Sequence, residues 1–433
     1  MKPVPTGDRL SARRRAFVAT ATVAIAAVAC RFLCVALIES RLADDPGRRF
    51  VVAGDAEGYW LLAGKLVAGE PFEIYEPPRR VMRMPGLPLL LASVRAIAGD
   101  AVTPARCVLA VVGVAACALT AVAGWRLAGP FVGLGAGALA AVSPLFVAFS
   151  PLLLSETLFA GVMTAAVVVT RESIVSSSKA VAIAAGTLHA AATLVRPTWV
   201  LVPPVVVAGW CLLCLRRRGG PAAYVSPVLL CAGFAAGMTP WVVRNFVVTG
   251  SPVLTTLWAG PSLYDGLNPD ATGASDMTFF EADGLPSTLS EAEVNREYTR
   301  RAVAFAAENP ARVLTLAVEK LKRFWNPFLN AGGFADGAAG LVIAAFEAGL
   351  FAAAAVGIWV KRRDAGFLLV TCGPTLFFAA VHAFFVGSVR YRVPGEYLLT
   401  VAAAVGLVAV TRSAVLVRLE RLLGLPTAPG AGS

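Results

Sequence analysis

The sequence contains few charged residues and only two histidines. Of its 433 residues, 15% are charged and 57% are hydrophobic. A soluble core of this length cannot hide so many apolar side chains, so the excess must face lipid. His189 and His382 lie far apart and have no cysteine or acid at metal-ligand spacing. The sequence therefore predicts no dedicated metal site.

Other signatures are also missing. The eight cysteines fall almost entirely inside apolar runs, so they predict neither a disulfide framework nor a zinc site. The sequence has no glycine-rich nucleotide-binding motif and no internal repeat. The net charge of +11 would favour a nucleic-acid partner in a soluble protein, but the basic residues stand in short clusters between apolar runs. In that position they indicate membrane topology.

Ten apolar runs are candidates for membrane spans, which need roughly 20 apolar residues each. The first follows Arg13, Arg14 and Arg15 and is too long for a signal peptide, so we expect an uncleaved anchor helix. The predicted spans are residues 16–38, 103–124, 131–148, 157–170, 180–194, 199–215, 222–243, 338–360, 366–386 and 395–411. This pattern predicts an all-α, polytopic membrane bundle.

The basic clusters predict the orientation of these spans. If the basic N-terminus is cytoplasmic, every second loop should be basic, and the clusters fit that alternation. They are Arg126, Arg171 with Lys179, Arg216–Arg218, Lys361–Arg363, and Arg412 with Arg418. Two long segments, about 39–102 and 244–337, are then exoplasmic. The composition and the absence of any N-x-S/T site favour a bacterial inner membrane. We expect one domain over residues 1–425 and a disordered tail at 426–433.

Both exoplasmic loops should contain helices that lie on the membrane. Residues 85–98 are apolar but too short to span, so they should form an interfacial or re-entrant helix. The helix preceding them should begin with Asp55 as its cap. In the second loop, Ser290 and Glu293 form a capping-box pattern for a helix that ends near residue 309. The next helix, over residues 313–325, should lie at the interface on its apolar face.

Charged groups at membrane depth are costly and become functional candidates. Eight such residues come from six segments that end on the predicted exoplasmic face, where they would form one pocket. They are Asp55, Glu57, Arg83, Glu156, Arg196, Arg244, Arg390 and Arg392. A carboxylate can accept the proton of an attacking hydroxyl, and arginines can neutralise a leaving phosphate. These are the groups that transfer of a sugar from a lipid phosphate requires.

Each candidate also has a purely structural interpretation. Asp55 is placed to cap a helix, and Glu156 is placed to favour a helix dipole in the first turn. The arginines at span ends, and Arg31 within the first span, are of the type that snorkels to water. No single residue decides between the two interpretations.

The order of several motifs resembles one family. Gly54 to Phe72 reads GDAEGYWLLAGKLVAGEPF, and RMPGLPLLLA and SPLLLSETLF follow. Later come LVRPTWVLVPP, TPWVVRNFVVTGSPV, ENPARVLTLAVEKLKRFWNP and RYRVPGEYLL. In this order they resemble the GT-C superfamily of membrane glycosyltransferases, specifically the bacterial relatives of protein O-mannosyltransferases and of lipid A aminoarabinose transferases.

The resemblance implies an inverting transfer of a sugar from a polyprenyl-phosphate donor to an exoplasmic acceptor, which is a cell-envelope glycan, a lipid or a protein. It implies Asp55 as the base, with Glu57 and Glu156 as further catalytic candidates. Many relatives have two adjacent acids here, whereas Ala56 separates the acids of this chain. The role of Glu57 and any use of a divalent metal therefore stay open, and no cofactor is predicted. The phosphate-side candidates are Arg83, Arg196, Arg244, Arg390 and Arg392.

Two other functions fit the same spans. A secondary transporter or lipid-linked glycan flippase would usually show repeat symmetry and broken helices, and neither is evident in the sequence. A non-catalytic subunit of envelope assembly would not need acids and arginines gathered at one face. Transfer of a labelled sugar separates the three hypotheses.

Overall fold

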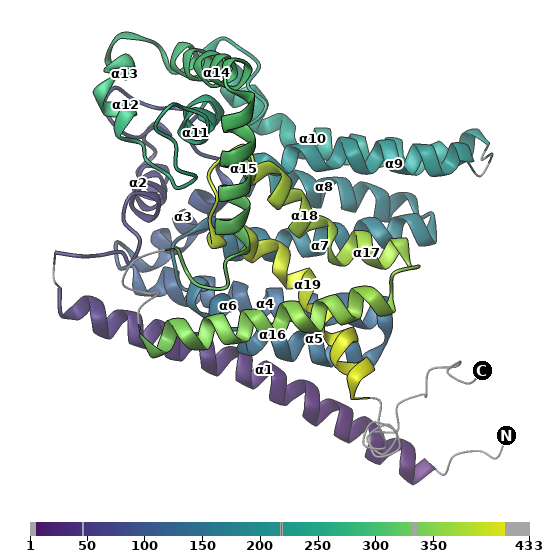
Figure 1. Ribbon diagram of the computed structural model, residues 1–433. Coiled ribbons are helices and arrows are strands. Elements are labelled where there is room, and N and C mark those ends of the chain that lie inside the picture. The colour runs from purple at the N-terminus through teal and green to yellow at the C-terminus, as the bar shows by residue number, and fades with distance from the viewer. Residues whose placement is uncertain (1–5, 46, 217, 219, 331–336, 412–433) are drawn as a thin grey trace.

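The chain forms a bundle of helices whose connecting helices gather at one end (Figure 1). The structure is a computed structural model, and it describes residues 6–45, 47–216, 218, 220–330 and 337–411. Within these residues no β-strand forms, only one isolated bridge between Ile74 and Arg79. The predicted all-α class is confirmed. The predicted tail at 426–433 lies outside the described residues.

A helix is present at each of the ten positions where an apolar run predicted a span. These helices are α1 (Thr6–Ala43), α4 (Thr103–Ala128), α5 (Pro130–Val142) with α6 (Pro144–Phe149), α7 (Ser155–Ser176), α8 (Lys179–Val195), η1 (Pro197–Leu201) with α9 (Val202–Arg216), η2 (Pro221–Tyr224) with α10 (Val225–Thr249), α16 (Ala338–Val360), α17 (Ala365–Thr371) with α18 (Gly373–His382), and α19 (Val389–Val410).

The number of helices that qualify as spans is smaller than ten. In the part of the chain that the structure describes, seven are long and apolar enough to cross a membrane, and the bent pair α17–α18 makes an eighth if it is one span. Helices α5 and α8 are apolar but shorter. At 1.5 Å per residue, the 13 residues of α5 reach only about 20 Å, against a hydrocarbon core of about 30 Å. Ser143 ends α5 and caps α6 by accepting a hydrogen bond from the backbone of Phe146.

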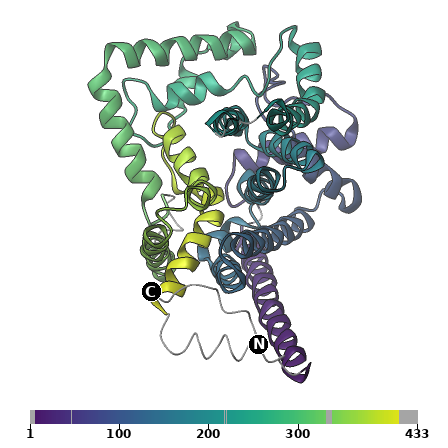
Figure 2. The same ribbon diagram turned by 90° about the vertical axis from the view of Figure 1, so that its right-hand side faces the viewer.

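The remaining helices belong to the two long loops. The first loop contains α2 (Asp55–Ala68) and α3 (Gly86–Ala98). The second contains α11 (Ala259–Gly266), α12 (Thr278–Ala282), α13 (Leu285–Thr288), α14 (Glu291–Glu308) and α15 (Pro310–Trp325). The predicted capping box is present, because Ser290 and Glu293 each bond the other's backbone. Figures 1 and 2 show α2 and α11–α14 at the end of the bundle opposite the start of α1, and we call this the loop end.

Helix α15 runs crosswise to the long helices of the bundle (Figure 1). Its Leu314 and Val318 side chains are exposed, as an interfacial helix without its lipid would show. Lys320 is fully buried instead, and its ammonium donates a 2.7 Å hydrogen bond to the Phe384 carbonyl. This bond ties α15 to the segment just before α19.

Helix α19 is the most enclosed of the span candidates, and α16 packs closely against it. A Cβ atom at Gly357 would lie 1.8 Å from the Ala402 carbonyl oxygen, and one at Gly406 would lie 1.9 Å from that of Ala353. The two backbones can meet only because these positions lack side chains. Glycine thereby fixes where α19 lies, and α19 carries Arg390.

The interpretation of Arg31 as a residue that snorkels to water is wrong. It does not snorkel: its side chain is fully buried and donates to Ser150 Oγ at 3.0 Å, to Cys117 Sγ at 3.0 Å and to the Ala141 carbonyl at 3.1 Å. Hydrogen bonds within the protein replace water for this guanidinium, so it joins α1 to the rest of the bundle.

Candidate active site

Asp55 begins α2 and faces two arginines. Its Oδ1 accepts a hydrogen bond from Arg83 Nη2 at 2.9 Å, and its Oδ2 accepts one from Arg390 Nη1 at 2.6 Å. The prediction that Asp55 caps α2 is wrong. Gly54 occupies the cap position with φ of 62°, which favours glycine, and the helix start has no side-chain cap. Both oxygens of the Asp55 carboxylate therefore bond the two guanidiniums and not the helix backbone.

Glu156 lies on the other side of Arg390. It is fully buried at the start of α7, and Arg390 Nε donates to its Oε1. Arg196, the C-cap residue that directly follows α8, completes the row with its Nη2 at 3.8 Å from the same oxygen. Arg83, Asp55, Arg390, Glu156 and Arg196 thus alternate in charge, and we call them the charged cluster. They come from five segments of the chain.

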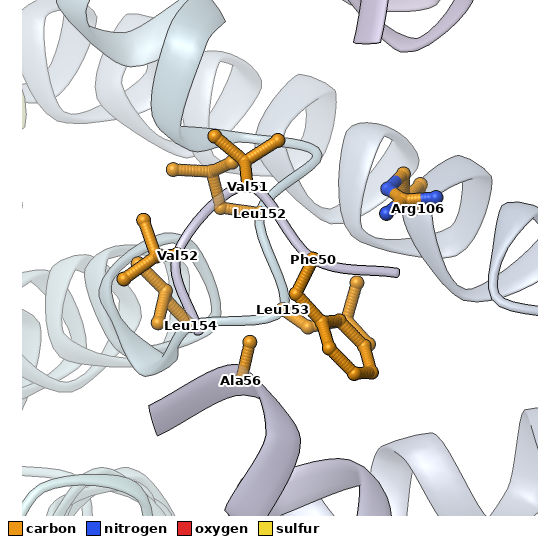
Figure 3. A pocket seen from close by; sticks show the side chains of 8 residues that line it. All are labelled: Phe50, Val51, Val52, Ala56, Arg106, Leu152, Leu153 and Leu154. Carbon is orange, nitrogen blue, oxygen red and sulfur yellow. The ribbon is translucent and has the colours of Figure 1, made fainter. Parts of the chain in front are cut away.

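Apolar packing brings the starts of α2 and α7 together. Figure 3 shows residues 50–52 beside residues 152–154, with Ala56 pointing toward the small space between them. Phe50, Leu153, Leu154 and Ala56 belong to one buried hydrophobic cluster. Because Asp55 and Glu156 each lie beside residues of this cluster, the two acids come within reach of the same arginine.

The arginines set the charge state of Asp55. Burial raises the pKa of its carboxyl group, but Arg390 and Arg83 lower it by more, through their charge and their hydrogen bonds. The pKa of Asp55 therefore lies well below its usual value, and the group is a carboxylate at neutral pH. The pKa of Arg83 shifts in the opposite direction. Burial lowers it, but nearby Tyr59 and Asp55 raise it by more, so the net change is upward.

Three atoms of the charged cluster are buried without a hydrogen-bond partner among the described residues. They are Arg83 Nε, Arg196 Nη1 and Glu156 Oε2. Most buried polar atoms in proteins are paired, so such a concentration in one cluster needs an explanation. Two free donors and one free acceptor beside an ionised carboxylate are suited to a ligand that carries both an anion and hydroxyl groups.

Aromatic rings hold the guanidiniums in place. The Tyr391 ring lies 5.4 Å from the guanidinium carbon of Arg196 and 5.9 Å from that of Arg390, and it stacks on His382 at 3.9 Å. His382 is fixed in turn, because its Nδ1 donates to the Val386 carbonyl at 2.8 Å. We did not predict either residue from the sequence. The position of Tyr391 between two candidate arginines was the signal that could have found it.

Three predicted site residues lie apart from the charged cluster. Glu57 is exposed, and the hydrogen bonds and ion pairs of the cluster do not include it. Arg244 donates to the backbone carbonyls of Arg80 at 2.6 Å and Phe72 at 2.9 Å, so it holds the first loop in place. The third, Arg392, is fully buried on α19.

Arg392 lies in the core between two acids. Its Nη2 donates to Glu347 of α16 at 3.1 Å, its Nε donates to Glu396, and its Nη1 donates to the Asn326 carbonyl at 3.0 Å. Glu347 and Glu396 are also fully buried. The contacts of Arg392 are therefore those of a buried ion triad that joins α16, α19 and the end of α15.

The donor set does not fit a resident metal ion. Among the residues that the structure describes, no three histidine, cysteine or acidic side chains gather as metal ligands do. Asp55 and Glu156 are separated by the guanidinium of Arg390, which bonds both of them. A cation between the acids would have to displace this arginine.

The fold and the charged cluster define a polytopic membrane protein with a buried ionic site at one end of its bundle. No family model and no curated protein matches the sequence. The structure is similar to the archaeal oligosaccharyltransferase AglB from Archaeoglobus fulgidus in complex with an inhibitory peptide and a dolichol-phosphate, with a TM-score of 0.56 and 13% identity over 96% of this chain. For the apo form of that oligosaccharyltransferase the TM-score is 0.59, with 15% identity over 95% of this chain.

The chain spans about half the length of that archaeal protein, covering 53% of it in the complex and 52% in the apo form. ArnT from Cupriavidus metallidurans bound to undecaprenyl phosphate is 16% identical over 92% of this chain and 77% of its own, with a lower TM-score of 0.40. The shared fold therefore follows from the archaeal protein alone. The chain therefore shares the fold of about half of the archaeal oligosaccharyltransferase, which agrees with the GT-C resemblance of its motifs.

Proposed function

We propose that this protein is an inverting glycosyltransferase that moves a sugar from a polyprenyl-phosphate donor to an acceptor outside the cytoplasm. The observation that carries the proposal is the charged cluster itself: a carboxylate held between arginines, with unpartnered donors beside it, at the loop end of a GT-C fold. The archaeal neighbour was solved with a dolichol-phosphate. A lipid phosphate is the kind of anion that free guanidinium donors bind.

The cluster can supply each part of the displacement. The acceptor hydroxyl oxygen attacks the anomeric carbon while Asp55 takes its proton. The bond from that carbon to the phosphate oxygen breaks, and the lipid phosphate leaves with the electron pair. Arg196 and Arg390 stabilise the charge that develops on the phosphate. Attack opposite the leaving group inverts the anomeric centre.

Donor binding would also make Asp55 a better base. In the free protein, Arg390 and Arg83 keep its pKa low. A bound phosphate shares these guanidiniums and adds a negative charge nearby, and both changes raise the pKa of the carboxylate. Proton acceptance then becomes easier only when the donor is in place.

The proposal places the charged cluster on the exterior side of a bacterial inner membrane, with the N-terminus in the cytoplasm. The test is transfer of a radiolabelled sugar from a polyprenyl-phosphate donor by the purified full chain in proteoliposomes. Formation of a product with the opposite anomeric configuration is expected. Transport of a lipid or solute without a new glycosidic bond would contradict the proposal.

We expect Arg83→Gln to move the acidic limb of the pH profile of kcat/KM to higher pH. Arg83 lowers the pKa of Asp55, so its removal raises that pKa toward the usual value of about 3.9. Activity requires the carboxylate, so it is present above this pKa and is lost as pH falls through it. Profiles of both proteins, with Arg80→Gln as an exposed arginine control, measure the shift. Coincident acidic limbs would contradict the assignment of Asp55 as the base.

We expect Arg196→Gln to lower kcat by about tenfold to a hundredfold, the effect of losing one hydrogen bond to a charged group. Its Nη1 is buried without a hydrogen-bond partner, which supports a role for Arg196 in binding the leaving phosphate. Single-turnover rates with saturating donor measure the effect. Arg126→Gln, at an exposed arginine on α4, is the control and should change the rate little. Equal rates for the two variants would remove Arg196 from the phosphate site.

A further inference from the structure

A second site lies apart from the charged cluster, at the loop end. It is a cleft of about 420 Å³ between the first loop and helices α12 and α13 of the second. Aromatic, apolar and charged side chains line it, among them Tyr75, Arg79, Met82, Trp258, Phe280 and Glu281. Apolar walls with a few polar groups are typical of a cleft that binds a small molecule.

Arg79 is the unusual residue of this cleft. Only 7% of it is exposed, and its guanidinium carbon lies 4.7 Å from the centre of the Phe280 ring and 5.6 Å from that of the Trp258 ring. Its side chain contacts these rings and charged neighbours but donates no hydrogen bond to any residue that the structure describes. The nearby acid Glu291 is already bonded to the backbone N–H groups of Arg80 and Val81. Arg79, a residue that is more than nine-tenths buried and that lines the cleft, therefore has unpaired donors that are free to bond a ligand there.

The rim of the cleft has the opposite character. Glu76 and Glu281 line it and are exposed, so their carboxylates offer acceptors only. A ligand that fits must accept hydrogen bonds from Arg79 at the base, donate to carboxylates at the rim and lie against aromatic rings. A neutral sugar chain has all three properties: its hydroxyls both donate and accept, and its C–H faces pack on the electron-rich faces of aromatic rings. An anionic ligand would face two like charges at the rim.

We propose that this cleft binds a neutral oligosaccharide, and that the acceptor of the reaction is therefore a glycan. The second part rests on the proposed function. Arg79 and Arg83 lie on the same short segment, and Arg83 bonds Asp55. Four residues of extended chain span at most about 14 Å. A glycan held at Arg79 by its inner sugars can thus present a terminal hydroxyl toward Asp55.

Equilibrium binding to the purified full chain tests the cleft without any transfer step. The probes are three neutral trisaccharides (maltotriose, mannotriose and triacetylchitotriose) and the acidic trigalacturonate, and their binding is measured by calorimetry in nanodiscs. At least one neutral probe should bind more tightly than the acidic one. Arg79→Gln should weaken that binding by at least about tenfold, as expected for the loss of charged hydrogen bonds. Arg80→Gln removes the neighbouring exposed arginine, which does not line the cleft, and should leave binding unchanged.

A second variant guards against misfolding of Arg79→Gln. Glu281 is exposed, so Glu281→Gln leaves the fold intact and should weaken binding by about threefold. Preference for trigalacturonate, no binding of any neutral probe, or equal binding by wild type, Arg79→Gln and Glu281→Gln would each overturn the inference. The two proposals fail differently. Absent sugar transfer with Arg79-dependent binding contradicts only the glycosyltransferase, whereas transfer without such binding contradicts only the cleft.

Discussion

Asp55→Asn is expected to lower the rate of sugar transfer by a factor of about 10² to 10⁴, the usual contribution of a general base. The amide keeps the size of the side chain but cannot take the proton of the acceptor hydroxyl. In the wild-type protein the carboxylate is ionised at neutral pH because Arg390 and Arg83 outweigh its burial. Single-turnover transfer in proteoliposomes, with saturating donor and acceptor, measures the change in the chemical step.

The control for this variant is Glu70→Gln. Glu70 is an exposed acid directly after the C-cap of α2, far along the helix from Asp55, and its substitution should leave the rate within about twofold. Donor binding by Asp55→Asn should survive, because the arginines remain. Full activity of a well-folded Asp55→Asn protein would remove this residue from the mechanism.

Arg392→Met is expected to reduce the free energy of unfolding by about 3–5 kcal/mol, as breaking a buried ion pair does. The variant leaves two fully buried carboxylates, Glu347 and Glu396, without their shared guanidinium. It also frees the carbonyl of Asn326 at the end of α15. Equilibrium unfolding in mixed micelles measures the loss.

Two further variants distinguish the loss of stability caused by breaking the buried triad from any general effect of removing an arginine. Arg362→Met removes an exposed arginine after α16 and should change stability by less than about 0.5 kcal/mol. Replacing the whole triad, with Arg392→Met, Glu347→Leu and Glu396→Leu together, should recover most of the lost stability, because no unpaired charge remains. Wild-type stability of Arg392→Met, joined to a loss of donor binding, would instead place Arg392 at the phosphate.

The positions of the helices could be predicted because lipid imposes a simple rule. A span must be apolar over its length and must satisfy its backbone hydrogen bonds within itself. All ten apolar runs are helices in the structure, and the Ser290–Glu293 capping box starts α14 as predicted. The number of true spans was harder to predict from the sequence. A single break at Ser143–Pro144 separates α5 from α6, and both helices are therefore short.

The candidate site was only partly predictable. Five of the eight candidate residues meet in the charged cluster, and three do not. Helix geometry explains part of the separation between residues inside and outside the cluster. Two residues that are two positions apart in the sequence are rotated by about 200° around a helix. Arg390 and Arg392 therefore point to opposite sides of α19, and Asp55 and Glu57 diverge in the same way on α2. The Glu396 partner, four residues after Arg392, was a signal in the sequence that we did not use.

What the amino-acid order determined by itself is the membrane class, the helices and the short set of charged residues that lipid makes costly. These depend on local composition and on one-dimensional spacing, which any chain in a bilayer must obey. Only the tertiary structure decided which charges share a site. Arg390 reaches both Asp55 and Glu156 because glycines let α19 pack close to α16 and apolar residues hold the starts of α2 and α7 together. Such contacts join residues up to 335 positions apart, and no local pattern encodes a distance of that kind.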